Sequence, residues 1–68
     1  MNQFKDTMDK YPIGTVLRLL GDYIEESHEV CGYEWYSDTV YLLFRDGRKL
    51  NMDREVLIEE VIQDADVA

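Results

Sequence analysis

Apolar and polar residues alternate most clearly between positions 39 and 52 of the chain. Two predicted strands, 39–44 and 49–52, flank the pair Asp46-Gly47. An Asp-Gly pair in this setting is the strongest short-range signal for a β-hairpin, because glycine adopts the positive φ that a tight turn requires. Side chains two apart share a face of a strand. One face of the predicted hairpin therefore carries five expected core residues: Val40, Leu42, Phe44, Leu50 and Met52.

Upstream of the hairpin, the pattern predicts a short helix and a first strand. Residues 2–10 are polar except for Phe4 and Met8, whose spacing of four gives a helix one thin apolar stripe. The helix ends before Pro12, because the residue that precedes a proline is disfavoured in the α region. Residues 15–20 are short, rich in β-formers and bounded by two glycines, so we expect them to form a strand.

The segment 21–36 has a less regular pattern. Residues 30–36 predict a strand, 25–29 predict a polar loop, and a helix over 23–29 is the alternative. Alternation puts three side chains on one face of the strand: Cys31, Tyr33 and Trp35. We expect Trp35 to lie in the core.

The C-terminal segment fits two structures. As a helix over 54–63, it would place four aliphatic residues in one stripe. As a 3₁₀-type turn over 53–57 followed by a strand over 58–62, it would complete the sheet, and its Val and Ile residues favour this second interpretation. Residues 63–68 predict a flexible tail.

The order of these elements resembles the small SH3-like β-barrel superfamily. The resemblance rests on a GTVLRL strand, a long loop, an EWYSDTVYLLFRDG hairpin and MDREVLIEEVI as turn plus last strand. It implies a mainly β fold, a barrel of about five antiparallel strands with a short N-terminal helix. The alternative is an α+β fold with a C-terminal helix. A single domain over 1–68 would comprise a helical arm (1–11), a barrel core (13–62) and the tail. The motifs of the peptide-binding SH3 family are not recognisable, so proline-peptide binding is not implied.

Charge narrows the range of partners. Fifteen Asp and Glu against seven Lys and Arg give a net charge of −8. Such a chain is repelled by nucleic acid and by anionic membranes, and it is attracted to a basic protein surface. Four basic residues cluster at the hairpin turn, where we expect Asp46 and Asp53 to pair with them: Arg45, Arg48, Lys49 and Arg54.

Candidate chemistry is sparse. His28 and Cys31 are the only residues of their types, and a nucleophilic or metal-binding pair of the two is the one enzymatic alternative. On a strand, residues three apart point to opposite faces, so we expect His28 in a loop and Cys31 buried. We expect no enzyme activity, catalytic residue, metal or cofactor. One cysteine and a charged N-terminus without an apolar core favour a cytoplasmic protein.

The acidic residues between 22 and 38 are interleaved with aromatic rings, a combination that suits protein binding. The residues expected to contact a partner are Asp22, Tyr23, Glu25, Glu26, Glu29, Tyr33, Glu34, Tyr36 and Asp38. We expect a non-enzymatic domain that binds a partner with a basic surface. Inhibition of that partner is one form of this hypothesis. In composition it is similar to small bacteriophage-encoded inhibitors. The alternative is a DNA mimic, and a homodimer through an edge strand or the Tyr41/Leu43 face also stays open.

Overall fold

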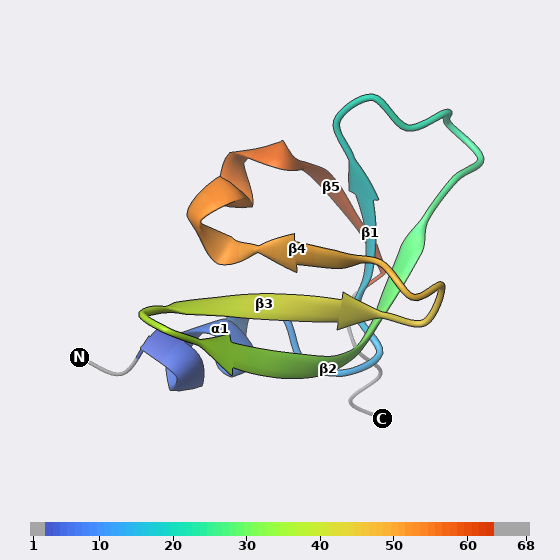
Figure 1. Ribbon diagram of the computed structural model, residues 1–68. Coiled ribbons are helices and arrows are strands. Elements are labelled where there is room, and N and C mark those ends of the chain that lie inside the picture. Colours follow the sequence, from blue (N-terminus) through green and yellow to red (C-terminus); the bar gives the residue numbers. More distant parts are fainter. Residues whose placement is uncertain (1–2, 64–68) are drawn as a thin grey trace.

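Five antiparallel strands and a short N-terminal helix form the computed structural model, which describes residues 3–63 (Figure 1). The elements in chain order are α1 (Gln3–Lys10), β1 (Val16–Leu19), β2 (His28–Tyr36), β3 (Thr39–Phe44), β4 (Lys49–Asn51), η1 (Met52–Leu57, a 3₁₀ helix) and β5 (Ile58–Gln63). The strands follow the order β4-β3-β2-β1-β5. The antiparallel sheet and the N-terminal helix were both predicted from the sequence.

The sheet does not close into a barrel. Strands β4 and β5 are its two edges, and η1 joins them along the chain without a ladder between them. Closure fails because β4 is only three residues long. The chain then turns into η1, which packs against β3 and β4. The closure implied by the SH3-like resemblance is therefore not found.

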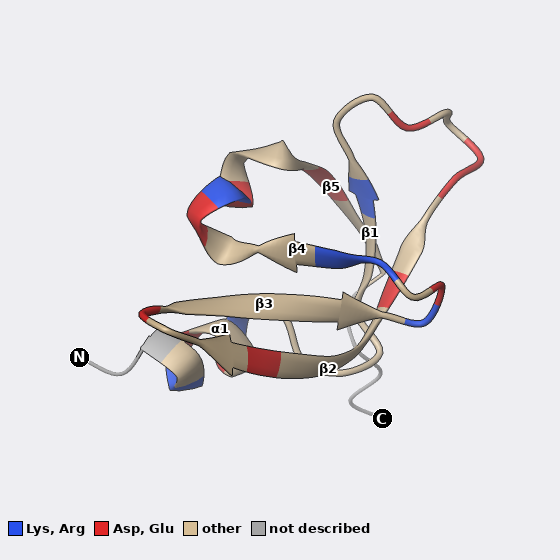
Figure 2. Ribbon diagram, viewed as in Figure 1, with Lys and Arg blue, Asp and Glu red and all other residues tan. Residues whose placement is uncertain are grey.

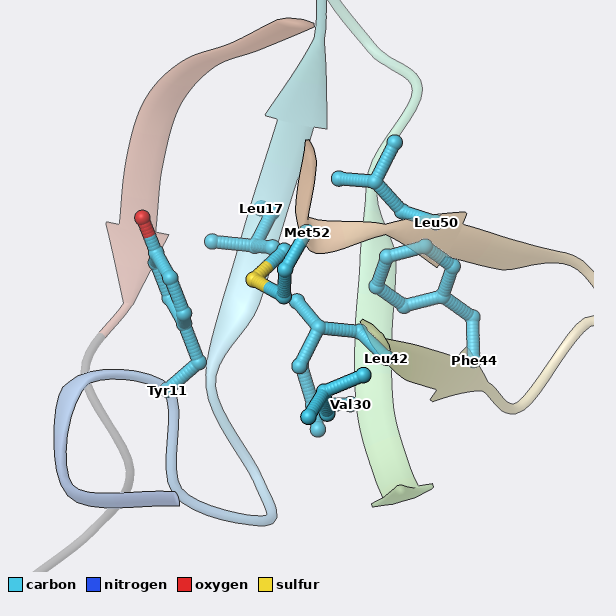
Figure 3. Packing of buried hydrophobic residues seen from close by; sticks show 8 residues of the cluster. Tyr11, Leu17, Val30, Leu42, Phe44, Leu50 and Met52 are labelled. Atoms are coloured by element: carbon cyan, nitrogen blue, oxygen red, sulfur yellow. The ribbon is translucent and has the colours of Figure 1, made fainter. Parts of the chain in front are cut away.

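The hairpin forms as predicted, with Leu42 paired to Leu50 across β3 and β4. Its turn has three residues, because the amide of Phe44 donates to the carbonyl of Arg48 and Gly47 has a φ of 92°. All five expected core residues are buried, and Tyr11, Leu17 and Val30 complete the cluster shown in Figure 3. Burying one such aliphatic side chain stabilises the fold by about 1.5–3 kcal/mol.

The C-terminal segment is a turn plus a strand, so the helix predicted as an alternative over 54–63 is wrong. Asn51 starts the turn, because its side-chain oxygen accepts hydrogen bonds from the amide of Asp53 and the hydroxyl of Thr39. The backbone of Arg54, with φ −110° and ψ 34°, interrupts the helical path. Strand β5 then pairs with β1 and ends at Gln63, which we expected in the tail. Residues 64–68 of that tail lie outside the described residues.

A register shift between Val30 and Gly32 changes which side chains of β2 face the core. The shift leaves Cys31 exposed as an extra residue, so Val30 and Tyr33 share a face, contrary to simple alternation. Trp35 is 50% exposed and not in the core, which corrects the prediction. It lies near the end of the strand, where the ring of Phe4 from α1 contacts it at a centroid distance of 6.0 Å.

Candidate protein-interaction surface

The expected partner-binding residues fall into two groups at opposite ends of β2 (Figure 1). The first group belongs to the β1–β2 loop (residues 20–27) and contains Asp22, Tyr23, Glu25 and Glu26. The second belongs to the far end of β2 and the turn into β3 and contains Tyr33, Glu34, Tyr36 and Asp38. Five strand residues, 28–32, lie between the two groups, which corresponds to a distance on the order of 20 Å. Glu29 lies in β2 beside the loop, so the sequence predicted one surface where the structure has two.

The β1–β2 loop is held to the hairpin turn by a buried histidine. His28 is 4% exposed, and its ring contacts that of Phe44 at 5.3 Å between centroids. Its Nδ1 lies 2.7 Å from Asp46 Oδ2, and its Nε2 lies 3.0 Å from Asp22 Oδ2. Each ring nitrogen thus faces a carboxylate oxygen that can accept a hydrogen bond from it. The expectation that His28 is a loop residue is wrong, because these two acceptors make its burial possible.

Both carboxylates of this bridge are anchored a second time by backbone. Asp22 Oδ2 also accepts from the amide of Leu19, and Asp46 Oδ1 accepts from the amide of Arg48. The Leu19 hydrogen bond and then His28 lower the pKa of Asp22, and the Arg48 amide and then His28 lower the pKa of Asp46. The two groups are therefore carboxylates at neutral pH. Asp22 fixes the base of the loop, and its contact with a partner stays a prediction.

Above this base, the loop exposes large apolar side chains. Leu20, Tyr23 and Ile24 are 63%, 74% and 82% exposed. The loop backbone is nevertheless hydrogen-bonded, because the amide of Tyr23 donates to Glu26 Oε1 and the amide of Glu26 donates to the carbonyl of Tyr23. The exposed rings and chains thus sit on a small turn with a defined shape.

The same loop carries acidic residues and no basic ones (Figure 2). Glu25 is exposed, and nothing in the described part of the chain pairs with its carboxylate. Leu20 and Ile24 were missed as candidates at the sequence level. Their signal was present, since two large apolar residues beside Gly21 and Glu25 contradict the polarity of a solvated loop.

The second group is largely engaged within the protein. Glu34 pairs with Lys49 at 3.1 Å, and Tyr33 donates its hydroxyl to the carbonyl of Tyr11. Burial raises the pKa of Tyr33. Tyr36 is 64% exposed and its ring lies 6.3 Å from that of Tyr41, whereas Asp38 is an exposed turn residue.

Ion pairs also place the basic residues differently from the prediction. Arg45 pairs with Glu29 at 3.0 Å and Lys49 with Glu34, so acids of β2 take the place of the expected partners Asp46 and Asp53. The hairpin turn is therefore not an isolated basic pole. Glu29 and Glu34 are likewise not free for a partner without breaking these pairs.

No Cys–His pair forms on β2. His28 points inward with both nitrogens bonded to aspartates, and Cys31 is exposed on the other side of the strand. Cys31 was expected to be buried, and the register shift explains why it is not. Among residues 3–63, no three His, Cys, Asp or Glu side chains are grouped closely enough to hold a metal ion.

A second cluster, which the sequence did not suggest, joins α1 to η1. Glu55 Oε2 accepts from Lys10 Nζ at 2.6 Å and from the Tyr11 hydroxyl at 2.5 Å. Lys10 and then Tyr11 lower the pKa of Glu55, while burial and then Glu55 raise the pKa of Tyr11 well above its usual range. Forty-four residues separate Tyr11 from Glu55, so no local pattern could have indicated this contact.

No family model matches the chain, and neither a curated protein nor a solved structure matches it significantly. None of the helices within residues 3–63 has the length and apolar character needed to cross a membrane.

Proposed function

We propose that this protein is a non-enzymatic binding domain that uses the β1–β2 loop to contact a partner protein with a basic surface. One observation carries the proposal. Leu20, Tyr23 and Ile24 are exposed on a loop whose backbone is fixed by the Asp22–His28–Asp46 bridge. A loop that is held in shape while it exposes apolar side chains is pre-organised for binding, because less conformational freedom remains to be lost.

The basic character of the partner follows from charge. The loop contains acidic residues without a basic one, and the whole chain has a net charge of −8. Carboxylates around an apolar centre steer a positively charged surface into contact and contribute mainly to the association rate. An enzyme inhibitor of phage origin is one protein that would use such a surface, in keeping with the composition.

DNA mimicry is the second function considered, and the geometry favours it less. A mimic needs a regular array of unpaired carboxylates, whereas Glu29 and Glu34 are bound to Arg45 and Lys49.

We also infer that the fold of this protein is a variant of the SH3-like architecture. The support for it is the tight hairpin, the 3₁₀ turn and the last strand, in the order that the resemblance implies.

A capture experiment with matched variants tests the loop. The tagged protein is incubated with bacterial lysate, and the partners are identified by mass spectrometry and then purified for calorimetry. Ile24→Ala is expected to weaken binding of the purified partner at least tenfold, because covering Ile24 contributes about 2 kcal/mol. Ile13→Ala is the control, since Ile13 is also exposed but lies between α1 and β1.

Charge is tested in the same way at the two ends of β2. Glu25→Lys is expected to slow association and to reduce its salt dependence, whereas Asp38→Lys is expected to have little effect. Equal losses for Ile24→Ala and Ile13→Ala, or a larger loss for Asp38→Lys than for Glu25→Lys, would assign binding to another surface. Competition by duplex DNA for the same partner site would support the mimic, and self-association in ultracentrifugation would identify a second copy as the occupant.

A further inference from the structure

A small cavity lies between α1 and η1, away from the β1–β2 loop. It has a volume of about 200 Å³ and is lined by Asp6, Thr7, Lys10, Tyr11, Met52 and Glu55. Ligand pockets for drug-sized molecules are larger, about 300–1,000 Å³, so this cavity suits a single side chain. Of these lining residues, Tyr11, Thr7 and Met52 are buried, and Tyr11 lies at the edge of the core cluster (Figure 3).

One of the residues that line the cavity, Lys10, carries a cation. Lys10 Nζ lies 2.6 Å from Glu55 Oε2 and 5.7 Å from the centroid of the Tyr11 ring. A carboxylate binds a cation through charge-assisted hydrogen bonds, and an aromatic face adds a cation–π attraction. The Lys10 side chain is 64% exposed, and an exposed pair of this kind contributes little to stability, so the ammonium is easily displaced.

Acceptors are left over around the same space. Within the described residues, no hydrogen bond engages Glu55 Oε1, and no group pairs with the Asp6 carboxylate. The protonated Tyr11 hydroxyl donates a hydrogen bond to Glu55 Oε2 and so holds this carboxylate in place. An ammonium occupies one acceptor at a time, whereas a planar guanidinium can engage two carboxylate oxygens and stack on the ring.

We propose that this cavity binds the guanidinium group of an arginine side chain from the partner protein, with Lys10 as the residue displaced. The proposal depends on the proposed function in one respect only, since the basic partner named there would supply the arginine. Glu55 would accept the guanidinium, the Tyr11 ring would lie against it, and Asp6 would add a second carboxylate at the rim. The α1–η1 surface would then be a second contact area that recognises one side chain.

The test uses small probes and amide chemical shifts. The labelled protein is titrated with Nα-acetyl-arginine methylamide, with the lysine equivalent and with the citrulline equivalent, which has the same shape without charge. The arginine probe is expected to cause saturable shifts in α1 and η1, to bind at least threefold more tightly than the lysine probe and to outcompete citrulline clearly. Shifts of equal size with citrulline, or saturable shifts only outside α1 and η1, would overturn the proposal.

Two variants and a control sharpen the result. Lys10→Met removes the resident ammonium and is expected to tighten arginine binding at least threefold, whereas Glu55→Gln is expected to weaken it at least fivefold. Glu59→Gln, a carboxylate change on β5, should leave it unchanged. If Glu55→Gln fails to fold, the Lys10→Met variant and the citrulline probe still test the proposal. Weaker binding of the arginine probe by Lys10→Met would overturn it. The probe does not touch the β1–β2 loop, so its failure leaves the loop proposal intact, and Ile24→Ala should not alter probe binding.

Discussion

Strand β2 begins with His28, which is 4% exposed, and ends with Trp35 and Tyr36, which are 50% and 64% exposed. The polar residue is covered because the β1–β2 loop and the hairpin turn both fold over it, each contributing an aspartate. The tryptophan is half-exposed, and its ring contacts the ring of Phe4 from α1. The comparison shows that burial along β2 is set by neighbouring elements and by available acceptors, more than by side-chain hydropathy.

The largest effect is expected at the histidine end. His28→Ala removes both hydrogen bonds and leaves Asp22 and Asp46 without their shared donor, so the free energy of unfolding should fall by about 3 kcal/mol. For a domain of this size, the melting temperature would fall by roughly 15 °C. Urea denaturation followed by circular dichroism measures the change. A loss below about 1 kcal/mol would mean that the bridge does not hold the loop.

A pH titration separates the charges of the bridge from its packing. Because the pKa values of Asp22 and Asp46 are lowered in the folded protein, their contribution to stability is present above their unfolded pKa of 3.8 and is lost as the pH falls through the folded values. The wild type should therefore lose more stability between pH 5 and pH 3 than Asp22→Asn does. Parallel curves of unfolding free energy against pH for the two proteins would show that the Asp22 carboxylate does not contribute to this loss.

A smaller effect is expected at the tryptophan end. Trp35→Ala should lower the free energy of unfolding by about 1 kcal/mol, because half of the ring is already in water and its contact is with Phe4. The same denaturation assay applies. A loss as large as that of His28→Ala would reverse the comparison between the two ends.

The smallest change expected is a gain of stability in the turn beside Trp35. Ser37 has a φ of 57°, a left-handed conformation that costs a side-chain-bearing residue energy and that glycine adopts freely. Ser37→Gly should raise the free energy of unfolding by about 0.5 kcal/mol, after allowance for the greater freedom of glycine in the unfolded chain. Asp38→Gly, in the same turn but without a positive φ, is the matched control and should not stabilise the protein.

The sequence was sufficient where local pattern and tertiary packing agree. The hairpin core around Leu42 and Leu50 follows from alternation across an Asp-Gly turn. For the C-terminal segment, a helix and a turn plus strand both stayed open, and the preference of Val and Ile for strands favoured the structure that forms. The prediction that Cys31 is buried is wrong, because one extra residue in β2 reverses the faces that alternation assigns. The prediction for His28 is also wrong, since its acceptor Asp46 lies eighteen residues away.

The positions of the candidate residues were predicted only in part, and their binding of a partner stays a prediction. Tyr23 and Glu25 are exposed on the β1–β2 loop as expected, but Asp22 is an anchor, and Glu29 and Glu34 are paired within the fold. Long-range partners decide whether a carboxylate is free, and a single sequence does not contain that information. The prediction omitted Leu20 and Ile24, two large apolar residues that are exposed on the same loop.

The central claim is that the β1–β2 loop has a fixed shape while it exposes Tyr23 and Ile24, and backbone ¹⁵N relaxation tests it most directly. We expect order parameters for residues 20–27 close to those of the sheet, about 0.85, and a fall below about 0.6 in His28→Gln, where one ring-nitrogen hydrogen bond is lost. Values below about 0.6 in the wild type would contradict the claim, because the loop would then be a flexible connection and its apolar residues would not form a defined surface.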